Sequence, residues 1–301
     1  MIFSKRLLAV LCLGLITQQG FSQQVDLFKM QDSTNAANAK PVNEPVINTF
    51  YSTRLVNSQT VEILSPGSMD LRVSHRFSPV NQGIYDMFGL DLASMRLGFD
   101  FGIVKDLMVG IGRTSTSKEY DWFVKYRLMH QKTGAGAPLS IDLLGAMAIK
   151  TLDFGPSFPA TTSDKTYYTA QVLIASKLNN NTSIQVSPTY NRYNRIIGFT
   201  GGGLDMFSIG FLARQKISKR VSINAEYFWQ VNRFDNTYDP LSIGVDINTG
   251  GHVFQLHFTN STGMNEHTFI HETTSSWTGK NSGIRWGFNI SRIFNIGGKK
   301  K

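Results

Sequence analysis

Residues 95–101 read MRLGFDF, and this stretch decides the fold class. Apolar and polar side chains alternate along it: Met95, Leu97, Phe99 and Phe101 are apolar, and Arg96, Gly98 and Asp100 lie between them. A period of two places successive side chains on opposite faces of an extended strand, whereas a helix repeats every 3.6 residues. The stretch therefore predicts a β-strand with one apolar and one polar face.

The same alternation returns along the rest of the chain. It occurs at residues 71–77, 120–128, 139–149, 221–231, 241–247, 252–258 and 284–290. We find no convincing amphipathic helix, so the sequence predicts an all-β fold. Many of these segments run for about 9 to 13 residues, which suits a tilted strand that crosses a bilayer, whereas soluble strands centre near 5 to 6. A soluble exported β-sandwich stays open as an alternative.

The connections between the predicted strands alternate in length. Short links fall at residues 65–67, 103–106, 131–137, 178–180, 217–218 and 248–251. Mostly longer ones fall at residues 78–92, 114–118, 151–165, 191–202, 232–240 and 260–282. Outer-membrane barrels have this arrangement, with tight periplasmic turns and long external loops. The order of the links places the C-terminus in the periplasm.

These patterns predict a closed antiparallel up-and-down transmembrane β-barrel of about twelve strands, with fourteen as the alternative. Ten strands are expected from Ala93 to the end, and residues 69–77 make an eleventh. Residues 46–64 are then expected to contribute one more strand, or two short ones, because single-chain bacterial barrels have an even number of strands.

The N-terminus reads as a secretory signal peptide over residues 1–22. Lys5 and Arg6 precede an apolar run, and small residues lie three and one positions before the expected cleavage after Ser22. The only cysteine, Cys12, lies in that run, which excludes a disulfide framework. Residues 23–45 are expected to form a flexible leader, residues 46–294 the barrel domain and residues 295–301 a basic tail.

The signal peptide and the strand pattern together predict export to the bacterial outer membrane. The expected partners are outer-membrane lipid and the barrel-insertion machinery, and small solutes are possible partners. The formal net charge of +9 is weak evidence for nucleic acid, and export argues against that partner. We predict no cofactor, and the oligomeric state stays open.

Several segments, taken together, resemble a known family. They are residues 49–77 (TFYSTRLVNSQTVEILSPGSMDLRVSHRF) and the later stretches YDMFGLD, MRLGFDFGI, LMVGIGR, HVFQLHFTNSTGMNE and GIRWGFNISRIF. In combination they resemble domain-of-unknown-function family 5777, a β-barrel family of Bacteroidota-type bacteria, over residues 46–294. The resemblance implies an outer-membrane-type barrel. It implies no established substrate, reaction or cofactor, so no functional residue is carried over.

Charged residues at the polar positions of the strands form the main candidate site. The predicted lumen-lining residues are Arg96, Asp100, Lys125, Arg127, Asp142, Glu226, Asp246 and Arg285. A charge on the lipid face costs about 2 to 4 kcal/mol at the bilayer midplane, so these side chains are expected to point inward. In an open lumen they would set solute preference, and if they pair across a narrow barrel they would fill it instead. A further hypothesis is that the leader and residues 46–64 plug the pore.

Two histidine patterns suggest other chemistry. His267 and His271, flanked by Glu266 and Glu272, could ligate a metal on a helix, but we expect residues 260–282 to form a surface loop or strand, so no metal site is predicted. His257, Thr259 and Ser261 share one strand face, as a lipid hydrolase would need. Neighbours two apart lie about 6 to 7 Å from each other and the face points inward, so no catalytic residue is predicted.

The sequence therefore predicts a non-enzymatic outer-membrane barrel that acts as a channel or porin-like transporter for small solutes. A non-conducting structural or surface-binding barrel is the alternative. A membrane-embedded lipid hydrolase is the third possibility.

Overall fold

The computed structural model describes residues 43–134, 136–156 and 159–297. The predicted signal peptide, residues 23–42 of the leader and residues 298–301 of the basic tail lie outside the described residues. Within the described residues, no helix combines the length and the hydropathy needed to cross a bilayer.

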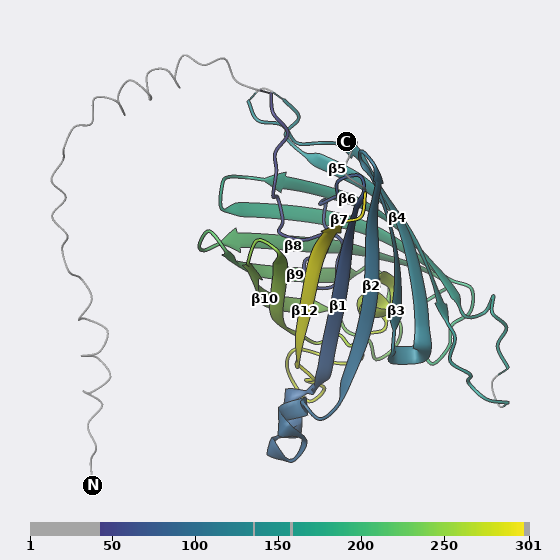
Figure 1. Cartoon of the computed structure of the whole chain (residues 1–301). Helices are drawn as coiled ribbons and strands as arrows, with labels where there is room; N and C mark the ends of the chain where they lie inside the picture. Colours follow the sequence, from purple (N-terminus) through teal and green to yellow (C-terminus); the bar gives the residue numbers. More distant parts are fainter. Residues whose placement is uncertain (1–42, 135, 157–158, 298–301) are drawn as a thin grey trace, which may run out of the picture. The chain divides into compact units, whose positions relative to one another are not determined.

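The described residues form twelve antiparallel strands that close into a barrel (Figure 1). The strands are β1 (Ser68–Pro79), β2 (Ala93–Val104), β3 (Leu107–Thr114), β4 (Glu119–Met129), β5 (Ser140–Lys150), β6 (Thr166–Lys177), β7 (Thr182–Tyr193), β8 (Asp205–Lys216), β9 (Val221–Gln230), β10 (Leu241–Asn248), β11 (His252–Thr259) and β12 (Arg285–Asn295). Each strand pairs with its neighbours in sequence, and β1 pairs with β12 to complete the ring. The predicted closed barrel of about twelve strands is confirmed.

The origin of the twelfth strand differs from the prediction. From Ala93 onward the described residues form eleven strands, whereas ten are expected from the sequence. Residues 46–64 were expected to supply a strand, but within them the described chain forms a single isolated bridge, between Arg54 and Gln59. This expectation was wrong because residues 49–64 lie inside the barrel, where their polar groups bond to inward-facing side chains instead of a neighbouring strand.

The strands bury their polar face and expose their apolar face. In β4, Lys125 is fully buried, whereas its neighbours Val124 and Tyr126 are 51% and 48% exposed. Large apolar side chains are exposed in the same way on β5, β7, β8, β9, β10 and β11. A soluble β-protein has the opposite arrangement, and an apolar outer band is what a barrel in a bilayer requires.

The connections place different structures at the two ends of the barrel. We call the end where β1 begins and β12 ends the terminal end, and the opposite end the loop end. The loop end carries the 3-10 helices η1 (Val80–Gln82), η2 (Ile84–Gly89) and η3 (Thr116–Lys118) and one α-helix, α2 (Glu266–His271). Connections at the loop end are mostly longer, which agrees with the predicted alternation.

Candidate functional site in the barrel interior

Residues 49–64, which we call the inner segment, lie within the barrel. Apolar residues such as Phe50 and Leu55 and polar residues such as Asn57 and Gln59 are all almost completely buried. The backbone reverses direction in a tight turn, in which the Leu55 N–H donates to the Ser58 carbonyl at 2.9 Å. The segment joins β1 through residues 65–67, so it enters from the terminal end.

Side chains from widely separated strands hold the backbone of the inner segment. Lys125 of β4 donates to the Thr60 carbonyl at 2.9 Å, and Gln185 of β7 donates to the Gln59 carbonyl at 2.8 Å. Asn289 of β12 donates to the Val56 carbonyl at 2.8 Å. These strands lie in different parts of the ring, so one segment can contact all of them only from inside. The inner segment therefore lies in the interior, as the plug hypothesis requires, and whether it plugs a pore stays a hypothesis.

Glu226 of β9 holds several groups of the inner segment at once. Its carboxylate accepts hydrogen bonds from the backbone N–H groups of Val56, Asn57 and Ser58 at 3.0 to 3.2 Å. It also accepts one from the Asn57 amide side chain at 2.8 Å. Successive N–H groups that converge on one carboxylate form an anion-binding nest, and hydrogen bonds to a charged acceptor are stronger than neutral ones.

Arginines and aspartates complete the attachment. Arg76 of β1 donates to the Asn57 side-chain oxygen at 2.7 Å, and Arg214 of β8 donates to the Thr49 carbonyl at 2.8 Å. The Thr53 hydroxyl donates to Asp100 of β2 at 3.2 Å. Buried charges are tolerated when they are paired and hydrogen-bonded, and the inner segment supplies many of these partners.

Helix α2 fills the interior from the loop end and meets the inner segment. Arg54 and Glu266 form a buried ion pair with an Nη1–Oε1 distance of 2.9 Å. An apolar cluster lies beside this pair and consists of Phe50, Leu55, Val61, Leu173, Ala175, Leu212, Phe228, Phe269 and Ile270. The cluster joins the inner segment and α2 to inward-facing residues of β6, β8 and β9.

His267 and His271 lie on α2, so the expected surface loop was wrong. Both residues are buried, and they are 1% and 0% exposed. Asn265 is the N-cap of the helix and its side chain accepts a hydrogen bond from the Thr268 N–H, while Glu266 occupies the first turn. An asparagine N-cap and an acidic first turn are helix-start signals that the sequence contained.

Burial keeps both imidazoles uncharged at neutral pH. It lowers the pKa of His271 to about 3, and together with nearby Lys150 and His271 it holds the pKa of His267 well below the usual value. His267 stacks on Tyr167 with ring centroids 4.3 Å apart. In the part of the chain that the structure describes, no group of three or more His, Cys, Asp and Glu residues is placed to hold a metal ion.

The eight residues predicted to line the lumen have different surroundings. Asp100, Lys125 and Glu226 contact the inner segment directly. Arg96 is paired with Asp121, with an Nε–Oδ1 distance of 2.9 Å, and Arg127 is paired with Asp142 at 3.1 Å. Asp246 is buried beside Asn224 and Gln255, and Arg285 donates to the Asn260 carbonyl near the loop end.

Several interior charges were missed by the sequence analysis. Asp70, Arg72 and Arg76 alternate with Leu71 and Val73, so the period of two applied to β1 would have found them. The ion pair of Arg54 with Glu266 could not be predicted from strand alternation, because both residues lie outside strands.

The candidate hydrolase residues form no catalytic pair among the described residues. The Thr259 hydroxyl accepts hydrogen bonds from the Ser242 hydroxyl at 2.9 Å and from the Ser261 N–H at 3.1 Å. The Ser261 hydroxyl lies 3.5 Å from the Phe269 carbonyl. None of these bonds engages His257, so the geometry does not support nucleophilic catalysis.

A closed barrel with an apolar outer face and a polar inner face defines the class of transmembrane β-barrels. Within this class, the chain belongs to domain-of-unknown-function family 5777, described as a membrane-bound beta barrel domain, which matches residues 50–294. The resemblance to this family is confirmed, and its Bacteroidota-type origin stays a prediction.

Comparison with solved structures finds barrels of low sequence identity. The KdgM porin is 9% identical with a TM-score of 0.46, and the match covers 75% of this chain and 99% of that chain. The NanC porin is 8% identical with a TM-score of 0.47 and the same coverages. OmpT of Vibrio cholerae is 9% identical with a TM-score of 0.38, over 77% of this chain and 100% of that chain. Comparison with curated proteins found no match.

Proposed function

We propose that this protein is a non-enzymatic outer-membrane barrel that is closed to solutes while the inner segment occupies its interior. The observation that carries the proposal is the attachment of one segment to β4, β7, β9 and β12 at the same time. The even number of antiparallel strands and the predicted signal peptide support the outer-membrane location. Of the two main functions predicted from the sequence, the occupied interior favours the non-conducting barrel over an open porin.

A gated channel for small solutes is the second candidate, and the chemistry of the inner segment favours it. The wall holds the segment mainly through hydrogen bonds and charges, such as those of Glu226 and Lys125. When a polar segment leaves, water replaces its hydrogen bonds, so the net cost is about 1 kcal/mol for each neutral bond and about 1.5 to 3 kcal/mol for each bond to a charged group. The segment is attached to the barrel wall covalently only at β1. Hydrogen bonds hold its other end, such as the one from the Val46 N–H to the Gln131 carbonyl at 2.8 Å, and these would have to break before it could withdraw.

Single-channel recording in planar bilayers tests both candidates. The chain from residue 23 onward is expected to be silent, and a variant without residues 23–64 is expected to show open steps if the inner segment closes a channel. The matched control lacks only residues 23–45 and should stay silent. Each variant is first checked for heat-modifiable gel migration, which reports a folded barrel.

The outcomes separate the candidates. Steady open steps from the full chain would contradict the closed barrel. A folded variant that stays silent without residues 23–64 would contradict the gated channel and leave the structural barrel, in which α2 and the wall side chains still fill the interior.

A further inference from the structure

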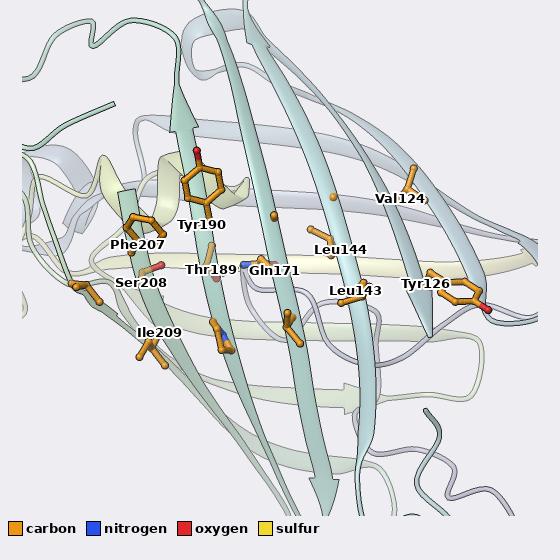
Figure 2. A pocket seen from close by; sticks show the side chains of 15 residues that line it. Val124, Tyr126, Leu143, Leu144, Gln171, Thr189, Tyr190, Phe207, Ser208 and Ile209 are labelled. Carbon is orange, nitrogen blue, oxygen red and sulfur yellow. Dashed lines mark hydrogen bonds between the residues drawn. The ribbon is translucent and has the colours of Figure 1, made fainter. Parts of the chain in front are cut away.

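A groove with a volume of about 860 Å³ lies on the outer surface of the wall across β4 to β8 (Figure 2). Outward-facing residues such as Tyr126, Leu143 and Phe207 border it, and each is more than 40% exposed. Among the described residues that line the groove there is no Asp, Glu, Lys or Arg. Its volume lies within the range of about 300 to 1,000 Å³ that is usual for small-molecule sites.

Small side chains make the floor of the groove. Gly145 of β5 pairs directly with Ala170 of β6. A Cβ added at Gly145 would meet no atom within 4 Å, so the space above this residue is empty of protein. On the far side, Tyr190 and Phe207 lie together with ring centroids 5.3 Å apart. The two aromatic rings therefore form a wall beside a shallow floor.

A break in the sheet lies at the same place. The pairing of β6 with β7 keeps one register, but it lacks the pairs Val172–Pro188 and Leu173–Ser187. Pro188 has no backbone N–H, so the ladder is one donor short there. Both Val172 and Pro188 line the groove. In hydrocarbon, a missing backbone hydrogen bond is costly, so this interruption is unusual in the wall of a membrane barrel.

The surroundings of the groove indicate which kind of molecule binds in it. The groove lies on the apolar outer face of a barrel from a membrane-bound family, so the neighbouring molecules are lipids. An uncharged lining suits a hydrocarbon chain better than a headgroup, and an unfilled hollow would lose dispersion contacts. Toward the loop end, Asp205 accepts hydrogen bonds from Tyr190 at 2.6 Å and from Arg192 at 2.7 Å, which gives the groove a polar, charged rim.

We propose that this groove binds one acyl chain of a membrane lipid from the leaflet at the loop end, with the headgroup near Arg192 and Asp205. The site is separate from the interior and does not depend on whether the barrel conducts. The acyl chain can lie over Gly145 and Ala170 because their side chains are small, whereas larger side chains would fill the floor of the groove.

Native mass spectrometry of the folded chain tests the proposal, with dioleoyl phosphatidylethanolamine added to the detergent micelles. The wild-type barrel is expected to retain one lipid. Ala170→Leu places a branched side chain in the groove and displaces about two methylene groups of the chain, so lipid retention should fall by about ten-fold. Ala213→Leu makes the same change at an exposed position of β8 outside the groove and should leave retention unchanged.

Two further observations keep the test decisive. If Ala170→Leu gives no heat-modifiable barrel, Gly145→Leu replaces it, since the space above Gly145 is open. Equal retention by the wild type and the groove variant, or equal loss in Ala213→Leu, would overturn the proposal. A dimer that disappears in the groove variant, with lipid retention unchanged, would assign the groove to a second copy of the chain instead.

Discussion

Glu226 illustrates how a buried charge is accommodated in this barrel. Removing a carboxylate from water costs several kcal/mol, and that cost is offset only when its lone pairs receive good hydrogen bonds. Three successive backbone N–H groups and the Asn57 side chain supply them. The carboxylate and the turn of the inner segment therefore stabilise each other, and neither is well solvated alone.

Glu226→Gln is expected to loosen the inner segment. The amide keeps the shape of the side chain but loses the charge and directs an NH₂ group at backbone donors, so the segment should be destabilised by about 2 to 3 kcal/mol. Hydrogen exchange of residues 53–61 measures this as faster exchange. Asp121→Asn is the matched control, because it neutralises another buried inward acid, whose partner is Arg96 of β2. Unchanged exchange in Glu226→Gln, or an equal effect in the control, would contradict the role assigned to Glu226.

The strands could be predicted from the sequence because each obeys one local rule. In β4, Val124, Tyr126 and Leu128 are exposed to the membrane side, and Lys125 between them is buried. This alternation is set by the strand itself and needs no knowledge of its neighbours. The barrel, the approximate number of strands and the inward direction of the charged side chains were all predicted from this alternation.

The inner segment and α2 could not be predicted in this way, because their positions depend on contacts between distant parts of the chain. Arg54 and Glu266 are 212 positions apart, and Asn57 and Glu226 are 169 apart. A polar stretch such as residues 52–60 is compatible with a loop, an irregular strand or a buried plug. Which of these structures the stretch adopts is determined by its contacts with the polar inner wall, and many strands contribute to that wall.

Helix α2 should leave the interior at low pH. Burial depresses the pKa of His271 from 6.5 to about 3, so the buried state is fully stabilised above pH 6.5 and loses stability as pH falls from 6.5 toward 3. The loss is about 1.4 kcal/mol for each pH unit, and His267 adds to it in the same direction.

Limited proteolysis of the loop at residues 260–284 measures this release. Cleavage is expected to be much faster at pH 5 than at pH 7.5. The double variant His267→Gln, His271→Gln should lose most of the difference, whereas His252→Gln, at the terminal end, should keep it. Equal protection of the loop at both pH values in the wild type would show that the helix position is not linked to these histidines.

The whole molecule has more interior space than its wall side chains would fill alone. A barrel of about 8 strands is filled by its own side chains, and one of about 16 to 18 strands leaves a water-filled channel. The described chain has twelve strands, between these limits, and the inner segment and α2 meet within its interior. Strand number alone therefore does not decide whether a barrel of this size conducts.

Crosslinking between the inner segment and the wall tests the occupied interior without any assay of transport. Asn57 Nδ2 lies 3.4 Å from Ser242 Oγ, and the only cysteine of the chain, Cys12, is replaced by serine for the experiment. The pair Asn57→Cys and Ser242→Cys should react with a short bifunctional thiol reagent in the folded barrel. The pair Asn57→Cys and Ile243→Cys should not, because Ile243 is the next residue of β10 and is exposed on the outer face. A folded barrel in which the first pair stays uncrosslinked, or in which both pairs react equally, would contradict an interior filled by residues 49–64.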